Sequence, residues 1–193
     1  MQRMKLLLGT LVVLCCSGLS LAQMQAPPPA KTPGDALNFD LTIAEHDFIP
    51  AAEAMPEDKY SFAPSTGEFK GVRTFAEQIK HVAAGNYAFG ASILGEKPPV
   101  DTGGENGPDS IKSKADIVKF AKDSFAYLHK ALASVTEKNE LDQIESPFGS
   151  KVARLSLASF STTHPFDHYG QMVEYLRMNG IVPPASRPQP EKK

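Results

Sequence analysis

The chain has very little cysteine, no tryptophan and no strong excess of charge of either sign. With 20 basic and 22 acidic residues and a net charge of −2, it lacks the basic face or high pI that is typical of nucleic-acid binders. Strand signals, meaning alternating β-branched runs that flank a hairpin turn, are missing. Nucleophile-elbow, Walker A, HExxH and Rossmann glycine motifs are also missing. We therefore expect no nucleic-acid partner and no familiar side-chain nucleophile.

The first 22 residues have the pattern of a secretory signal peptide. Arg3 and Lys5 precede an apolar stretch of 11 residues, Leu6–Cys16, and Ser20 and Ala22 supply the small residues of a cleavage site. An uncleaved anchor helix is the alternative, but a membrane span needs about 20 apolar residues. The pattern predicts cleavage after Ala22, export to the periplasm or the extracellular space, and no stable membrane anchor afterwards.

Both cysteines, Cys15 and Cys16, lie inside this leader. Cleavage would leave a mature chain without cysteine, so disulfides, thiolate nucleophiles and thiolate metal ligands are excluded from it. Loss of Arg3 and Lys5 would leave 18 basic and 22 acidic residues, a net charge of −4. An exported protein of this kind depends on its own core or on a bound metal ion for stability.

The remaining chain divides into a Pro-rich linker over 23–36, one domain over 37–182, and a flexible Pro-rich tail over 183–193. Apolar residues recur at helical spacing in four stretches of the domain. We expect Pro50 to kink or shorten the first helix. Ser113 or Ser110 is expected to cap the third helix and Ser150 the fourth. The predicted helices are 37–55, 73–94, 113–135 and 150–178.

Amphipathic helices bury their apolar stripes best against one another, which predicts an all-α four-helix bundle. The connection over 95–112 is long and rich in glycine and proline, whereas a tight antiparallel turn needs only a few residues. We therefore expect a crossover that leaves helices two and three parallel, in an up-down-down-up order.

His164 and His168 are four residues apart in the predicted fourth helix, so they share one face. Imidazole pairs at this spacing often hold a transition metal. The same spacing also suits a polar face with one buried, hydrogen-bonded histidine. Pro165 directly follows His164 and predicts a break at Thr163–His164.

The segments Arg73–Ala83 (RTFAEQIKHVA) and His164–Pro184 (HPFDHYGQMVEYLRMNGIVPP) together resemble the DinB/YfiT-like superfamily. The resemblance covers about 37–184. It implies a four-helix bundle in which His81 from helix two and His164 and His168 from helix four bind a divalent metal ion. Some members of the superfamily are thiol transferases that use a metal to activate a small thiol.

Three imidazole ligands leave coordination positions open for water or substrate. We expect zinc first and nickel second, and an affinity that falls as the pH drops through about 6.5, the ordinary histidine pKa. These features suggest an exported metal-dependent enzyme, either a hydrolase or a thiol-group transferase. The alternative is a non-catalytic module with a structural metal, which a fourth protein ligand such as Asp167 or Glu45 would favour.

Other polar residues near the pair have weaker assignments. Gln171 could hydrogen-bond a ligand or a metal-bound water, and Asp167 or Glu174 could orient an imidazole. His46 and His129 lack partners at ligand spacing, so we expect both at the surface or the bundle edge. The substrate is expected to be a small molecule of unspecified class, and a homodimer stays open.

Overall fold

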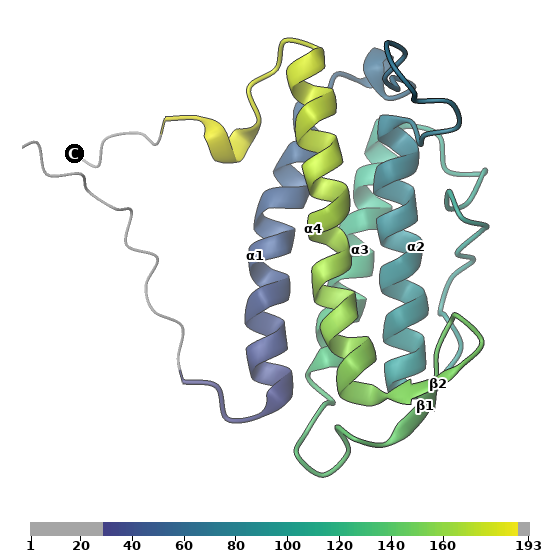
Figure 1. The fold of residues 1–193 in the computed structure, drawn as a ribbon, viewed down its shortest axis with the longest axis vertical. Helices are drawn as coiled ribbons and strands as arrows, with labels where there is room; N and C mark the ends of the chain where they lie inside the picture. Colours follow the sequence, from purple (N-terminus) through teal and green to yellow (C-terminus); the bar gives the residue numbers. More distant parts are fainter. Residues whose placement is uncertain (1–28, 189–193) are drawn as a thin grey trace, which may run out of the picture.

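The computed structural model describes residues 29–188, so the predicted leader over 1–22 lies outside the described residues. Four long helices form one bundle, with a single small two-stranded sheet in the described part of the chain (Figure 1). The predicted all-α class is confirmed. The elements are α1 (Pro33–Ala54), a 3-10 turn (Glu57–Lys59), α2 (Phe75–Leu94), α3 (Lys114–Leu132), β1 (Gln143–Glu145), β2 (Lys151–Ala153), α4 (Arg154–Met178) and a second 3-10 turn (Pro184–Ser186).

The helices follow an up-down-down-up order (Figure 1). The start of α1 lies beside the end of α3, where the Gly34 amide donates to the Val135 carbonyl at 3.1 Å. The end of α4 lies beside the start of α2, where the Tyr175 hydroxyl donates to the Arg73 carbonyl at 3.0 Å. Helices α2 and α3 both run from the top to the bottom of the bundle in Figure 1, so they are parallel, as the long connection between them predicts.

Local capping explains where most of the helices begin and end. Thr74 and Glu77 form a reciprocal capping box at the start of α2, and Gly95 ends that helix with φ 72°. The Ser113 hydroxyl accepts from the Asp116 amide at the start of α3. The end of α2 and the cap of α3 agree with the predictions, whereas α2 begins at Phe75, slightly later than the predicted start at residue 73.

Helix α1 begins earlier than predicted. Thr32 and Asp35 form a second capping box, so the helix starts at Pro33 and includes the last residues assigned to the linker over 23–36. Proline suits the first position of a helix because its missing amide would be unpaired there. The helix also continues through Pro50 to Ala54 and is not shortened at that residue.

The prediction that the chain has no strands is wrong for one short segment. β1 pairs antiparallel with β2, and Gln143 is opposite Ala153 in the register. Ser150, predicted to cap the fourth helix, lies in the turn of this hairpin, and α4 begins at Arg154. Strands of three residues are too short to show the alternation on which the prediction depends.

The predicted break at Thr163–His164 is also wrong, because α4 is one helix from Arg154 to Met178 with Pro165 inside it. Apolar side chains on both sides of the proline are buried in the same core, among them Leu157 and Met172. Packing of both halves against the bundle outweighs the local preference against an interior proline.

The core lies between the four helices and is built from large apolar side chains. Close approach of α1 and α3 depends on Gly34, where an added Cβ would lie 2.3 Å from the Leu132 carbonyl oxygen. The largest fully buried side chains include Phe48, Phe75, Phe125, Leu41, Met55, Ile79, Ile93, Leu128, Met172 and Leu176.

Within residues 29–188, no helix combines the length and apolar character needed to cross a membrane.

The connection between α2 and α3 is held against α2 in a defined path. Gly103 and Gly107 adopt φ of 64° and 74°, which favours glycine. A Cβ on Gly107 would lie 2.6 Å from the Lys80 Cβ, and the Lys80 ammonium donates to the Pro108 carbonyl at 3.0 Å. These contacts bring the main chain at Glu105 over the middle of α2.

Candidate metal centre

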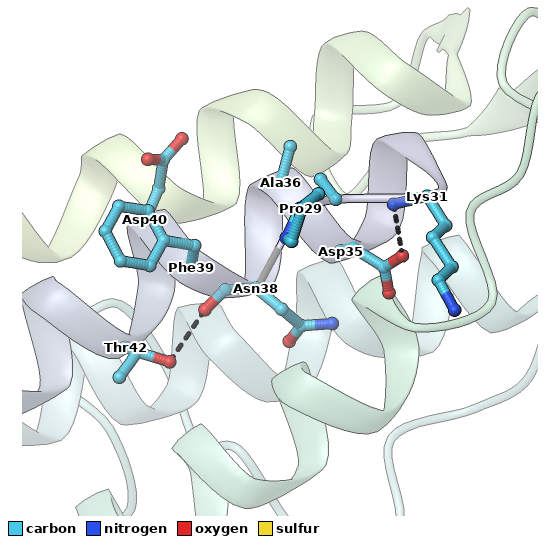
Figure 2. A pocket seen from close by; sticks show the side chains of 9 residues that line it. Pro29, Lys31, Asp35, Ala36, Asn38, Phe39, Asp40 and Thr42 are labelled. Atoms are coloured by element: carbon cyan, nitrogen blue, oxygen red, sulfur yellow. Dashed lines mark hydrogen bonds between the residues drawn. The ribbon is translucent and has the colours of Figure 1, made fainter. Parts of the chain in front are cut away.

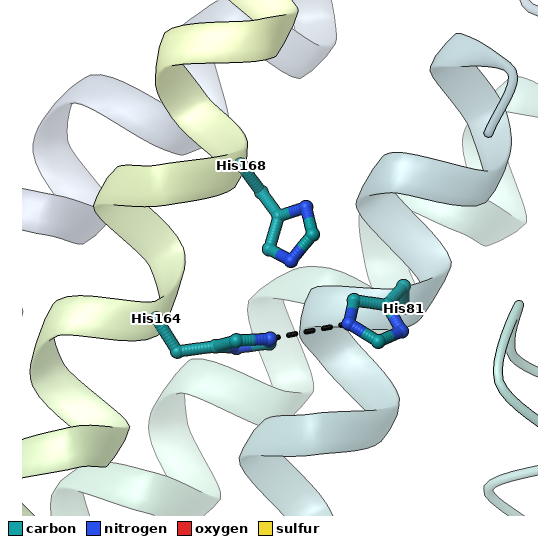
Figure 3. A group of neighbouring side chains, drawn as sticks. All are labelled: His81, His164 and His168. Atoms are coloured by element: carbon teal, nitrogen blue, oxygen red, sulfur yellow. Dashed lines mark hydrogen bonds between the residues drawn. The ribbon is translucent and has the colours of Figure 1, made fainter. Parts of the chain in front are cut away.

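Three histidines from two helices meet on one side of the bundle (Figure 3). His81 comes from α2, and His164 and His168 come from successive turns of α4. One ligand atom of each lies within 4.8 Å of the others. The Nε2 atoms of His81 and His164 are 3.2 Å apart, and the ring centroid of His168 is 4.7 Å from each of the other two. The structure thus brings together the three residues that the sequence singled out.

The outer nitrogens of two of these rings have hydrogen-bond acceptors. His81 Nδ1 is 2.5 Å from the main-chain carbonyl oxygen of Glu105. His168 Nδ1 is 2.6 Å from the side-chain oxygen of Gln78. A ring that donates from Nδ1 while neutral has its lone pair on Nε2. Both contacts therefore direct an Nε2 lone pair toward the centre of the cluster.

Gln78 is one of a chain of oriented polar groups. Its amide nitrogen donates to Gln171 Oε1 at 2.8 Å, and the Gln171 amide donates to Asp167 Oδ2 at 3.3 Å. Because each amide nitrogen has an acceptor, the Gln78 oxygen is left to face His168. Gln171 and Asp167 thus act on the His168 imidazole through Gln78. The sequence did not lead us to predict a role for Gln78. Its position one turn before His81 is the signal that could have indicated it.

The third ring, His164, is oriented by packing. Its Nδ1 is buried and has no hydrogen-bond partner among the described residues. The ring lies against Gly85, where an added Cβ would be 3.0 Å from the His164 Cε1. A glycine inside a helix costs about 1 kcal/mol relative to alanine, and the space that it leaves for this imidazole explains its presence in α2.

Burial favours the neutral form of all three imidazoles. Burial lowers the pKa of His164 to about 3, and the nearby His168 and His81 add to the shift because adjacent positive charges repel. Burial, with His81 and Arg73, lowers the pKa of His168 to about 4. Burial also lowers the pKa of His81. Protons therefore compete with a metal ion at a pH below the 6.5 expected from the sequence.

One of the nitrogen separations in the cluster matches a tetrahedral zinc ion. Two nitrogens that are each about 2.0–2.1 Å from a tetrahedral zinc ion lie about 3.3–3.4 Å apart. The observed separation of 3.2 Å between the Nε2 atoms of His81 and His164 is close to this value. The described residues add no fourth His, Asp or Glu to the group. These three histidines could hold a metal ion and leave at least one coordination position open.

The cluster opens into a pocket of about 410 Å³. Arg73 lies on its wall, pairs with Glu105 at 2.7 Å, and adds to the lowering of the three histidine pKa values. Asp167 is largely exposed at the opening, with its Oδ2 3.9 Å from His168 Nε2. Three phenylalanines complete the wall: Phe89, Phe148 and Phe160.

A larger hollow, of about 770 Å³, lies at the start of α1 (Figure 2). Among the described residues its wall comes from residues 29–42, and none of these is a histidine. It borders residue 29, where the described part of the chain begins. The pocket next to the three histidines is therefore the candidate site despite its smaller volume.

The other two described histidines lie outside the cluster. His46 is exposed beside Asp47. His129 lies in the seam between α1 and α3, 2.6 Å from Asn38 Oδ1 and 3.1 Å from Glu45 Oε2. Glu45 is thus engaged away from the three histidines, and it is not a fourth ligand. Glu174, the other carboxylate suggested as an orienting group, is exposed.

Comparison with known proteins gives a family match and a structural match. The family model described as the DinB superfamily matches residues 40–172. The crystal structure of a DinB-like protein from Bacillus subtilis superposes with a TM-score of 0.59 at 21% identity, covering 76% of this chain and 93% of that one. At this identity the likeness shows the fold alone. No curated protein matches the chain.

Proposed function

The chain belongs to the DinB superfamily, and on that premise we propose that it is a metal-dependent enzyme whose divalent ion is held by His81, His164 and His168. One observation carries the proposal. Three neutral imidazoles converge at the wall of an open pocket, with no fourth ligand among the described residues. Catalytic zinc sites keep a position open in this way, whereas structural sites are closed by four protein ligands.

When bound, such an ion acts as a Lewis acid and lowers the pKa of a coordinated water or thiol toward neutrality. The side chains around it have distinct parts in this proposal. Gln78 and the Glu105 carbonyl hold two imidazoles in the metal-binding tautomer. The Asp167 carboxylate, exposed at the opening, is placed to accept a proton from an entering water or thiol.

The reaction class that follows is hydrolysis or thiol-group transfer. Both need an open coordination position, a nearby proton acceptor and a pocket, and neither needs a side-chain nucleophile. The competing view, a non-catalytic module with a structural metal, calls for a fourth protein ligand. Glu45 is paired with His129, and Asp167 does not join the group of mutually close ligand atoms.

Export is part of the proposal and depends on the leader over 1–22. N-terminal sequencing of the protein from its native host tests it. We expect the mature protein to begin at Gln23 and to give no reaction with thiol reagents. Material that begins at Met1 would contradict export by cleavage.

The enzyme proposal is tested by metal analysis followed by an activity screen. We expect about one zinc or nickel ion per purified chain, and turnover in a panel of esters and thiol acceptors that a chelator abolishes and added metal restores. His168→Ala should lose both the metal and the turnover, and His46→Ala is its matched control because His46 is exposed and lies outside the cluster. Absence of bound metal would refute the proposal, and stoichiometric metal without turnover would favour the non-catalytic module.

A further inference from the structure

We propose that Phe148, Phe160 and Phe89 form a subsite for an aromatic or bulky alkyl group of the substrate, beside the atom that reacts at the three histidines. The inference rests on the proposed function and deepens it, because it names the chemical character of the substrate. It follows from where these three rings lie and from how exposed two of them are.

The three rings form one cluster whose outer members face solvent. The centroid of Phe89 lies 5.9 Å from Phe148 and 5.4 Å from Phe160, and the last two are 5.7 Å apart. Phe89 is 5% exposed, but Phe148 is 65% exposed and Phe160 is 43% exposed. Contiguous exposed apolar side chains commonly mark binding sites, and the bundle core does not require these two.

The aromatic cluster is continuous with the histidine site. The Phe89 ring meets His164 edge-to-face at 5.4 Å and 88°, and Phe160 lies 5.9 Å from the same imidazole. All of these residues line the same 410 Å³ pocket. A small molecule that reaches the histidines therefore has the phenylalanine rings against one side.

The hairpin holds Phe148 in place at this opening. Phe148 lies in the turn between β1 and β2, where the Ser146 amide donates to the Ser150 carbonyl at 2.9 Å and Gly149 adopts φ 77°. The Phe148 amide also donates to the Ser146 hydroxyl at 3.3 Å. A turn whose main chain is already hydrogen-bonded does not have to be ordered when a ligand binds, which favours affinity.

The rest of the pocket wall is polar. Arg73 and Glu105 form an ion pair there, and Asp167 is at the opening. A wholly polar substrate would leave the phenylalanine rings in water, and a wholly apolar one would bury these charges without partners. The chemistry of the walls points to a small amphipathic substrate with its apolar group on the phenylalanines and its polar, reacting end at the histidines.

Two hydroxamates test this inference without an activity assay. Acetohydroxamate and benzohydroxamate carry the same metal-binding group, and the second adds a phenyl ring. We would load the full chain with zinc and measure both dissociation constants by calorimetry for the wild type, Phe148→Ala, Phe160→Ala and the control Phe69→Ala. Phe69 is 41% exposed, like Phe160, but does not line the pocket.

We expect benzohydroxamate to bind the wild type about 10- to 100-fold more tightly than acetohydroxamate, as burial of a phenyl group predicts. Phe148→Ala and Phe160→Ala should each reduce this ratio severalfold and leave acetohydroxamate binding unchanged, and Phe69→Ala should leave the ratio unchanged. A ratio that is the same in all four proteins would overturn the subsite. So would a wild type that is dimeric by size-exclusion chromatography and becomes monomeric in Phe148→Ala with no change in the ratio, because a second copy would then cover the rings. Failure of zinc or acetohydroxamate to bind would instead refute the proposed metal site.

Discussion

Replacement of Gln78 by methionine should weaken zinc binding without removing any ligand. Gln78 is 1% exposed and accepts from His168 Nδ1 at 2.6 Å. Methionine fills a similar volume but accepts only weakly, so His168 loses the group that fixes its tautomer and Gln171 loses its donor. Loss of such an orienting contact typically costs 10- to 100-fold in metal affinity, which corresponds to about 1.4–2.7 kcal/mol.

The assay is a competition titration of zinc against a chromophoric chelator at pH 7. Gln78→Glu separates the two contacts of Gln78, because its carboxylate still accepts from His168 Nδ1 but no longer donates to Gln171 Oε1; we expect it to bind zinc more tightly than Gln78→Met. Gln143→Met is the matched control, since Gln143 is exposed on the hairpin. If Gln78→Met binds zinc within about threefold of the wild type, Gln78 does not orient the imidazole.

Three further predictions concern the ligands, the pH dependence and the core. His168→Ala should abolish stoichiometric zinc and His129→Ala should leave it unchanged; equal metal content by mass spectrometry would mean that the ligand set is wrong. In the metal-free protein, the free energy of unfolding should rise with pH between about 4 and 6.5, because unfolded histidines bind protons there while folded His164 and His168, with pKa values of about 3 and 4, do not. Urea melts at several pH values check this, and the rise should be smaller in His168→Ala. Gly34→Ala should lower the free energy of unfolding by about 1–3 kcal/mol, because its Cβ would meet the Leu132 carbonyl; an unchanged urea midpoint would contradict this.

The parts of the fold that sequence predicted well are those with local signals. Gly95 marks the end of α2 and Ser113 marks the start of α3 in the sequence, because capping involves only neighbouring residues. The effect of Pro165 could not be predicted in this way. Whether a proline breaks a helix depends on how both halves pack, and that is a property of the whole bundle.

The candidate site shows the same division. His164 and His168 were evident from their spacing, and His81 was added by the family resemblance. Gln78 acts on His168 from another helix, 90 residues away in the chain, so its role depends on how α2 packs against α4. The aromatic cluster could not be predicted from the sequence, because Phe148 lies on a hairpin whose strands are too short to show an alternation of apolar and polar residues.

The acceptor for His81 Nδ1 is a main-chain carbonyl, so no side-chain substitution at Glu105 can delete it. What positions this oxygen is the path of the loop, which depends on the positive φ angles of Gly103 and Gly107. The residues that orient the His81 imidazole are thus Gly103 and Gly107, although neither of them contacts the ring through a hydrogen bond; the contacting atom belongs to Glu105. An alanine scan of the contacting side chains would score Glu105 as dispensable for this contact, whereas Gly107→Ala, whose Cβ would lie 2.6 Å from Lys80 Cβ, would disturb the site from a distance.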